Sequence, residues 1–423
     1  MAKPRILIQM HYLELGGAET ALIGLLQSLT PDKADVDLFL NDPRGEMLAY
    51  VPQWVRLLPP VPVYTMTERP LLEVVRCGFW RLAAARLLAK LACWWRWRRR
   101  GSVDSPEARG GLALACAGRW TSRVLPSLRQ LGHYDLAVSF MTPHQVVLAK
   151  VDAEVKVCWI HTDCVAAGVD AALELPAWAG YDRIVGVSDD VVTRFCEVFP
   201  SLADRVVKIE NILSPRFVRD RAAGPRPADM PPPGGDGLTL LTIGRYVPAK
   251  RLERVPEICR RLLAEGLLVR WYIIGYGGDD GAAIRAAIRE AGVKDSVTVL
   301  GRRANPYPYI RWCDWYVQPS LYEGKAVTVR EAQLLGRPVI VTDYATASSQ
   351  VTDGTDGVIV PMDEAACARA MVRAMTDGAL RERITAWLQT HDYGFTDEAD
   401  KLTALLEEVR EERRRRGAKD DLL

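Results

Sequence analysis

The sequence lacks the features of secreted, disulfide-bonded and membrane-spanning proteins. Its nine cysteines form no CxxC pair, and the closest two, Cys158 and Cys164, are six positions apart. Neither a disulfide scaffold nor a zinc ribbon is therefore indicated. No stretch reaches the roughly 18 uncharged apolar residues that a membrane span needs. No apolar signal region precedes the strand-like run from Arg5 to Met10. We expect a cytoplasmic protein in a reduced compartment, neither secreted by that route nor integral to a membrane.

The sequence also lacks an excess of charge of one sign, because 55 Lys and Arg nearly balance 53 Asp and Glu. Basic residues are nevertheless concentrated in one segment. The run from Leu71 to Arg100 has a helical pattern with apolar residues on one side and arginines on the other. It ends in a cluster of tryptophans and arginines: Trp94, Trp95, Trp97, Arg98, Arg99 and Arg100.

Tryptophan favours the headgroup level of a bilayer, and each basic residue near an anionic leaflet contributes roughly 1 kcal/mol. This segment therefore predicts a helix lying in the surface of an anionic membrane. The alternative is an amphipathic core helix with a solvated basic end. Nucleic-acid binding is a third use of such a patch, but no recognised module accompanies it, so we expect no nucleic-acid partner.

At 423 residues the chain exceeds what a single core usually covers, which favours two domains. Strand-like and helix-like segments alternate along the chain, a pattern typical of a mostly parallel sheet. The expected strands of the first half are Arg5 to Met10, Val36 to Leu40, Asp135 to Phe140, Val155 to Ile160 and Arg183 to Val187. Those of the second half are Leu238 to Ile243, Val269 to Ile274, Ser296 to Leu300, Trp315 to Gln318, Pro338 to Thr342 and Gly357 to Val360.

Between these halves, the segment from Ser214 to Gly237 is poor in apolar residues and rich in proline and glycine. We therefore predict an α/β protein with two doubly wound, Rossmann-like domains facing a cleft. The expected divisions are a domain at 1–213 with the membrane-surface helix near 71–100, a linker at 214–237, a second domain at 238–395 and a C-terminal helix at 396–423.

The most informative motif places two glutamates eight positions apart. Glu323 comes just after a predicted strand, and Glu331 falls inside an apolar run at helical spacing. In an open α/β sheet, ligands bind beyond the carboxyl ends of the strands, where helix N-termini attract phosphates. Carboxylates there would repel phosphate, so we expect these two to bind hydroxyls, which a nucleotide sugar supplies. The alternative is an exposed acidic pair at a helix start.

Other groups follow predicted strands at the same edges. Arg245 and Lys250 come after the first strand of the second half, and a forked guanidinium with a nearby ammonium suits a diphosphate. Gly16 and Gly17 open a helix after the first strand, where backbone amides can approach a ligand closely. His161 follows another strand. Each of these is a weak signal alone, since strand-to-helix turns, solvated basic loops and packed histidines share the same patterns.

Together these residues resemble the retaining family 4 glycosyltransferases with a GT-B fold. The resemblance rests on Gly16, Gly17 and Glu19, on His161, Ser188 and Asn211, on Arg245 with Lys250, and on Glu323 and Glu331 followed by Gly336 and Pro338. Many members carry proline three positions after the first glutamate, where this chain has Ala326. Lys325 with Ala326 instead resembles the subset associated with surface polysaccharide assembly.

The resemblance implies that the domain at 1–213 binds the acceptor and that the domain at 238–395 binds the nucleotide sugar. It also implies a role for each matched residue. Glu331 would hold ribose hydroxyls and Glu323 the donor sugar, while Arg245 and Lys250 would neutralise the diphosphate leaving group without a metal. The Gly16 and Gly17 loop would close over the donor, and His161 would contact the transferred sugar. The catalytic set is Glu323, His161, Arg245 and Lys250. The expected donor-binding residues are Gly16, Gly17, Arg245, Lys250, Gly275, Arg302, Glu323, Gly324, Lys325, Ala326, Val327 and Glu331.

The resulting expectation is a metal-independent, retaining hexosyltransferase without a cofactor. It would move a hexose or N-acetylhexosamine from a nucleotide-diphosphate sugar, with UDP as the expected nucleotide, to a saccharide or lipid-linked acceptor. It would act peripherally on the cytosolic face of the plasma membrane. The alternatives are a nucleotide-sugar epimerase on the same fold and a non-catalytic nucleotide- or membrane-binding module. The C-terminal helix is expected, by the same resemblance, to return to the first domain.

Overall fold

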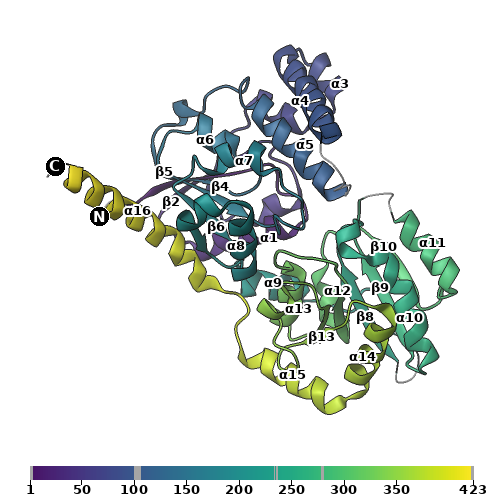
Figure 1. Ribbon diagram of the computed structural model, residues 1–423. Coiled ribbons are helices and arrows are strands. Elements are labelled where there is room, and N and C mark those ends of the chain that lie inside the picture. Colours follow the sequence, from purple (N-terminus) through teal and green to yellow (C-terminus); the bar gives the residue numbers. More distant parts are fainter. Residues whose placement is uncertain (1–2, 100–105, 233, 235–236, 278–280, 421–423) are drawn as a thin grey trace. The chain divides into compact units, whose positions relative to one another are not determined.

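The computed structural model describes residues 3–99, 106–232, 234, 237–277 and 281–420, and the chain divides into two compact units. The first unit comprises residues 1–212 together with 396–423, and the second comprises 213–395. The segment from residue 396 onward thus belongs to the first unit. Both units are α/β layers in which helices flank a parallel sheet (Figure 1).

The first unit is built on a parallel sheet in the order β3-β2-β1-β4-β5-β6-β7. Its strands are β1 (Arg5–Met10), β2 (Asp35–Leu40), β3 (Arg56–Leu57), β4 (Tyr134–Ser139), β5 (Ala153–Ile160), β6 (Arg183–Gly186) and β7 (Val206–Lys208). Its α-helices are α1 (Gly17–Ser28), α2 (Pro62–Thr65), α3 (Leu71–Arg76), α4 (Trp80–Arg99), α5 (Pro106–Thr121), α6 (Gln145–Lys150), α7 (Ala171–Trp178), α8 (Asp189–Val198) and α16 (Asp400–Asp420). Short 3-10 helices lie at Glu46–Tyr50, Met66–Glu68, Arg129–Leu131, Pro200–Arg205 and Thr396–Ala399.

The second unit is built on a parallel sheet in the order β10-β9-β8-β11-β12-β13. Its strands are β8 (Leu238–Ile243), β9 (Val269–Ile274), β10 (Val297–Gly301), β11 (Trp315–Gln318), β12 (Val339–Thr342) and β13 (Val358–Val360). Its α-helices are α9 (Pro215–Ala222), α10 (Val255–Ala264), α11 (Ala282–Ala291), α12 (Tyr307–Trp312), α13 (Val327–Leu334), α14 (Glu364–Thr376) and α15 (Gly378–Thr390). The 3-10 helices are η5 (Pro248–Lys250), η6 (Leu252–Arg254) and η7 (Ala347–Ser349).

The strands form where the sequence predicted them because their apolar runs are buried on both faces, as parallel sheets require. Ile6, Leu7 and Ile8 of β1 are fully buried, and so are Trp271 and Ile273 of β9. The doubly wound prediction is confirmed for both units. Sequence analysis missed β3 and β7, which have two and three residues at the two edges of the first sheet. Strands of two or three residues are too short to show a pattern of apolar residues in the sequence.

The predicted linker is not free chain. Ser214 caps α9 by accepting a hydrogen bond from the amide of Phe217, and Phe217, Val218 and Ala222 are buried. Further along, Met230 is fully buried, and Asp229 pairs with Arg303. The stretch from Ser214 to Met230 therefore packs as part of the second unit. Its proline and glycine content masked an eight-residue helix that starts at a proline, a favoured first helical residue.

The C-terminal helix α16 lies against the first unit (Figure 1). Its Arg410 bonds the carboxylates of Asp135 and Glu154, and its Arg413 is 2.6 Å from the Asp182 carboxylate. Buried Leu402, Leu405 and Leu406 provide its apolar face. Charge pairing along one side of the helix thus anchors it to the ends of β4, β5 and β6.

Candidate functional site

The second unit carries an ion pair across the centre of its sheet. β8 lies between β9 and β11, so the strand order reverses direction between β8 and β11, which is where open α/β sheets bind ligands. Lys250 follows β8 on η5, and Glu323 follows β11. The Lys250 Nζ lies 2.6 Å from each oxygen of the Glu323 carboxylate. Two predicted site residues, distant in sequence, are thus in direct contact at this position.

The Glu323 carboxylate is held by further hydrogen bonds on one oxygen. Ser320 Oγ donates to Oε1 at 2.5 Å, and Gln318 Nε2 donates to it at 3.1 Å. Gln318 is itself fixed by the hydroxyls of Tyr316 and Thr328. Within the described residues Oε2 accepts only from Lys250, so it keeps capacity for a ligand hydroxyl. Sequence analysis missed Gln318 and Ser320, although an amide ending an apolar strand was a usable signal.

Glu331 lies inside α13, as predicted, and only 3% of its surface is exposed. The Tyr307 hydroxyl donates to Oε1 at 2.8 Å, and this is the one hydrogen bond that the carboxylate of Glu331 accepts from the described residues. Burial raises the pKa of Glu331 to about 7, against the opposing effect of the Tyr307 hydrogen bond. A buried carboxylate with one partner is costly to keep. Sequence reasoning missed Tyr307, which comes from the neighbouring helix α12.

The loop between the two glutamates is buried and fixed from the β12 side. Ala326 is the N-cap of α13, and its backbone N–H and C=O bond the side chain of Gln350 at 3.0 and 2.6 Å. Thr346 donates to the Glu323 carbonyl at 3.0 Å. Lys325 is 8% exposed, with its Nζ 5.7 Å from the centre of the Phe395 ring. Gly324 and Val327, also predicted for the donor, are buried beside them.

Three other predicted residues follow β8, β9 and β10. The Arg245 side chain is exposed, and no hydrogen bond or ion pair joins it to the described part of the chain. Arg302 is exposed, with its guanidinium 5.0 Å from the centre of the Tyr276 ring. A Cβ on Gly275 would lie 1.9 Å from the Gly244 carbonyl oxygen. Gly275 therefore serves close packing of two strand ends, and its donor contact stays a prediction.

The predicted residues of the first unit lie at the carboxyl edge of its own sheet. Gly16 is the N-cap of α1 and Gly17 its first residue, and a Cβ on Gly16 would lie 2.2 Å from a Glu19 carboxylate oxygen. His161 follows β5, and its Nε2 lies 2.9 Å from the Phe140 carbonyl oxygen. Burial lowers the pKa of His161 to about 4, so the ring is neutral at pH 7.

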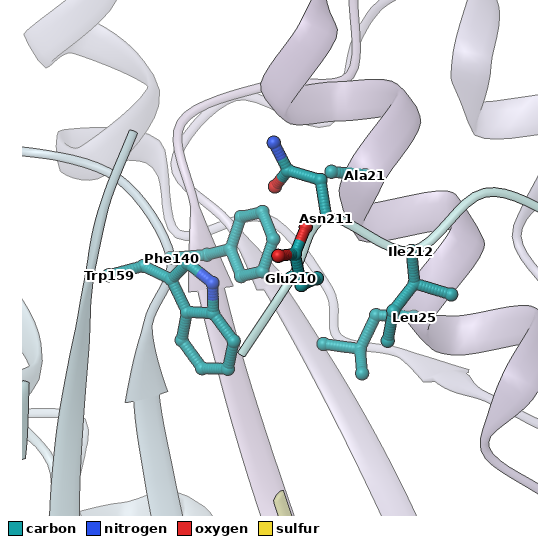
Figure 2. Close-up of a pocket in the computed structure, with 7 residues that line it drawn as sticks. All are labelled: Ala21, Leu25, Phe140, Trp159, Glu210, Asn211 and Ile212. Carbon is teal, nitrogen blue, oxygen red and sulfur yellow. The ribbon is translucent and has the colours of Figure 1, made fainter. Parts of the chain in front are cut away.

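Figure 2 shows a small hollow beside these residues, between α1 and the ends of β4 and β5. The Phe140 and Trp159 rings stack along one wall at 5.2 Å, and Glu210, Asn211 and Ile212 line the hollow together with Ala21 and Leu25 of α1. The Asn211 Oδ1 is buried without a hydrogen-bond partner in the described chain. The hollow has a volume of about 10 Å³, which is room for about one water molecule. It is too small to hold a sugar.

The predicted membrane segment forms two helices, α3 and α4, rather than one. Trp94 and Trp95 are 56% and 49% exposed, with Arg98 and Arg99 stacked over their rings. Trp97 differs from the prediction because it is partly buried on the α5 side, beneath Arg109. At 100° per residue, Trp97 lies about 160° around α4 from Trp95 and about 60° from Trp94, which turns it toward the packed side of the helix. Arg100 lies outside the described residues.

No cluster of His, Cys, Asp and Glu suited to a metal ion occurs among the described residues. No helix in the described ranges combines the length and apolarity needed to cross a bilayer.

The sequence of the second unit and the fold of the chain are both similar to those of known glycosyl transferases. Residues 237–377, which include Lys250, Glu323 and Glu331, match the family model described as "Glycosyl transferases group 1". The whole chain resembles an Anabaena protein, Alr3699/HepE, solved with UDP and glucose (TM-score 0.64, 15% identity, 96% of this chain and 100% of that one). It also resembles Staphylococcus aureus TarM solved with UDP (TM-score 0.63, 12% identity, 95% and 99% covered). The fold is therefore GT-B.

In sequence, the chain is 27% identical to the alpha-D-kanosaminyltransferase of Streptomyces kanamyceticus over 49% of this chain and 55% of that protein. The chain spans about half the length of the curated relatives it matches. The match to group 1 glycosyl transferases thus falls within the second unit, and the lysine and the two glutamates lie within the matched region.

The raised pKa of Glu331 gives a stability prediction. In the unfolded chain the pKa of Glu331 is near 4.3, whereas in the folded chain it is about 7. Between these pH values the carboxyl group is ionised in the unfolded state and protonated in the folded state. The free energy of unfolding therefore falls as pH rises from about 4 to 7. Glu331→Gln keeps the oxygen that accepts from Tyr307 and removes the ionisation. We expect the variant to be more stable than the wild type by up to about 3 kcal/mol at pH 8 and nearly unchanged at pH 4. Denaturant unfolding at both pH values measures this, and equal stability at pH 8 contradicts it.

Proposed function

We propose that the chain is a retaining, metal-independent hexosyltransferase that uses a nucleotide-diphosphate sugar, with UDP as the preferred nucleotide. The observation that carries the proposal is the Lys250 to Glu323 pair at the reversal point of the second sheet. The match of residues 237–377 to group 1 glycosyl transferases supports it. The relatives named as glycosyltransferases and the neighbours solved with UDP support the donor class.

The geometry suits departure of a nucleotide diphosphate. Breaking a glycosyl-phosphate bond develops negative charge on the leaving group, and fixed cations stabilise that charge. Lys250 donates two of its three N–H groups to Glu323, and the third can donate to a phosphate oxygen. Arg245, exposed after the same strand, can add a forked contact. In this mechanism Lys250 and Arg245 hold the diphosphate while Glu323 holds the sugar that leaves it.

The two glutamates suit the neutral parts of the donor. Glu323 Oε2 can accept a sugar hydroxyl, and Glu331, placed on α13, would accept from the ribose. A buried carboxylate that costs stability is expected where binding needs it. His161 is neutral and cannot supply a positive charge at pH 7, which agrees with a hydrogen-bonding role toward the transferred sugar. That role and those of Gly16 and Gly17 are carried over from the family resemblance.

Replacing either member of the ion pair tests the chemistry. We expect Lys250→Met and Glu323→Gln each to lower turnover of a UDP-sugar by about a hundredfold or more, because leaving-group stabilisation and sugar positioning are lost. Lys294→Met is the control, since Lys294 is an exposed lysine of the same unit. Removing one partner of a buried pair costs about 3 kcal/mol, so melting curves must show folded variants. Unimpaired turnover in both folded variants contradicts the proposal, and an isomerised nucleotide sugar formed without acceptor indicates an epimerase.

We further propose that the enzyme acts peripherally at an anionic, cytosolic membrane face through α4, on a saccharide or lipid-linked acceptor. The opposite faces of α4 are both apolar. One face packs on α5 and α3 through residues such as Ala89 and Leu82. The other exposes 44% to 65% of each of Trp80, Leu87, Leu88, Leu91, Trp94 and Trp95. Lys90 and Arg81 flank this exposed stripe, and Arg98 and Arg99 end it, an arrangement that suits a helix lying in the headgroup layer.

Vesicle co-sedimentation tests the membrane proposal. Arg98→Ser with Arg99→Ser should weaken binding to phosphatidylserine-containing vesicles by about thirtyfold, because two basic residues contribute roughly 1 kcal/mol each. Arg414→Ser with Arg415→Ser on α16 removes the same charge elsewhere in the unit and should have little effect. Equal binding of the first double variant and the wild type would show that the stripe has another purpose.

A further inference from the structure

The first unit has a histidine–glutamate contact at the reversal point of its own sheet. β1 lies between β2 and β4, so the strand order reverses direction between β1 and β4. His11 directly follows β1, and Thr142 lies just beyond β4. The His11 Nε2 is 3.0 Å from the Thr142 carbonyl oxygen. The imidazole therefore bridges the two strand ends where a ligand crevice is expected.

The other nitrogen of His11 holds Glu68. Nδ1 lies 2.8 Å from Glu68 Oε1, and the same oxygen accepts from the Thr67 hydroxyl at 3.2 Å and from the Asn41 amide at 3.5 Å. Glu68 Oε2 accepts no hydrogen bond from the described residues, and 18% of the side chain is exposed. One carboxylate oxygen is thus fixed by three donors while the other is open.

The charge on Glu68 is maintained. Burial alone would raise the pKa of Glu68, but the hydrogen bond and charge of His11, with the bonds from Asn41 and Thr67, outweigh burial and lower it. The nearby Arg69 and Arg44 are paired with Asp42. An ionised carboxylate with a free oxygen accepts strongly from hydroxyl groups and repels phosphate.

The same segment is attached to α4. Arg86, on α4, donates from one guanidinium nitrogen to the carbonyls of Met66 at 3.1 Å and Arg69 at 2.5 Å, on both sides of Glu68. A residue of α4 therefore holds the chain on both sides of Glu68 in place.

We propose that Glu68, positioned by His11, binds a hydroxyl of the uncharged saccharide part of the acceptor. The inference rests on the proposed function and names a residue that recognises its acceptor. It makes Glu68 a specificity-determining residue and His11 a positioning residue.

Dodecyl glycosides and the matching free sugars are the acceptor probes, with the nucleotide sugar that the protein consumes as donor. Glu68→Gln keeps an oxygen for His11 and replaces the open oxygen by an NH2 group. We expect wild type to glycosylate at least one of these probes. The variant should raise that acceptor KM about tenfold, with donor KM unchanged. Glu68→Asp, which keeps the charge, should give an intermediate value, and Glu73→Gln, five residues away, should match wild type.

An acceptor KM that is unchanged in folded Glu68→Gln overturns the inference, and so does a loss confined to kcat. Transfer by wild type to water alone, with no probe glycosylated, also overturns it. A wild-type chain that neither binds nor consumes any nucleotide sugar contradicts the proposed function itself, and titration of the donor without acceptor separates that outcome.

Discussion

The contact between Lys250 and Glu323 is the interaction on which the account of the second unit depends. It joins residues that follow β8 and β11, the strands on either side of the point where the sheet order reverses. A lysine and a glutamate removed from water are stable only with good geometry and satisfied hydrogen bonds. Gln318 and Ser320 supply those bonds from beneath, and Tyr316 holds Gln318 in turn. The polar network lies under the site and leaves one N–H and one carboxylate oxygen for a ligand.

Both units place a basic residue against a glutamate at the point where the sheet order reverses, but they leave different atoms free for a ligand. In the second, a cation keeps a free N–H beside a held carboxylate, which suits a donor with both phosphate and hydroxyl groups. In the first, His11 has both ring nitrogens engaged, and the free atom is an oxygen of Glu68. That difference suits a partner with hydroxyls and no phosphate at this point. The division of labour expected of the two domains, acceptor in one and donor in the other, is consistent with it.

Much of this was predictable from sequence, and the failures have physical reasons. The fully buried strands could be predicted because they are apolar runs, and Glu323 and Glu331 were placed correctly on a loop and a helix. Lys250 was singled out by its position after a strand, but its contact with Glu323 depends on strand order. Gln318, Tyr307, His11 and Glu68 were missed because their roles arise from neighbours distant in sequence. Trp97 was misplaced because a run of tryptophans was treated as one surface, whereas helical geometry sends alternate members to opposite faces.

Calorimetric titration of UDP and of the UDP-sugar that the protein consumes into wild type, Glu323→Gln and Lys250→Met tests the central claim most directly. The account predicts that wild type binds the UDP-sugar more tightly than UDP, that Glu323→Gln loses this difference while keeping its affinity for UDP, and that Lys250→Met weakens both. Folded Glu323→Gln with the full preference for the UDP-sugar, or folded Lys250→Met with wild-type affinity for UDP, would contradict it.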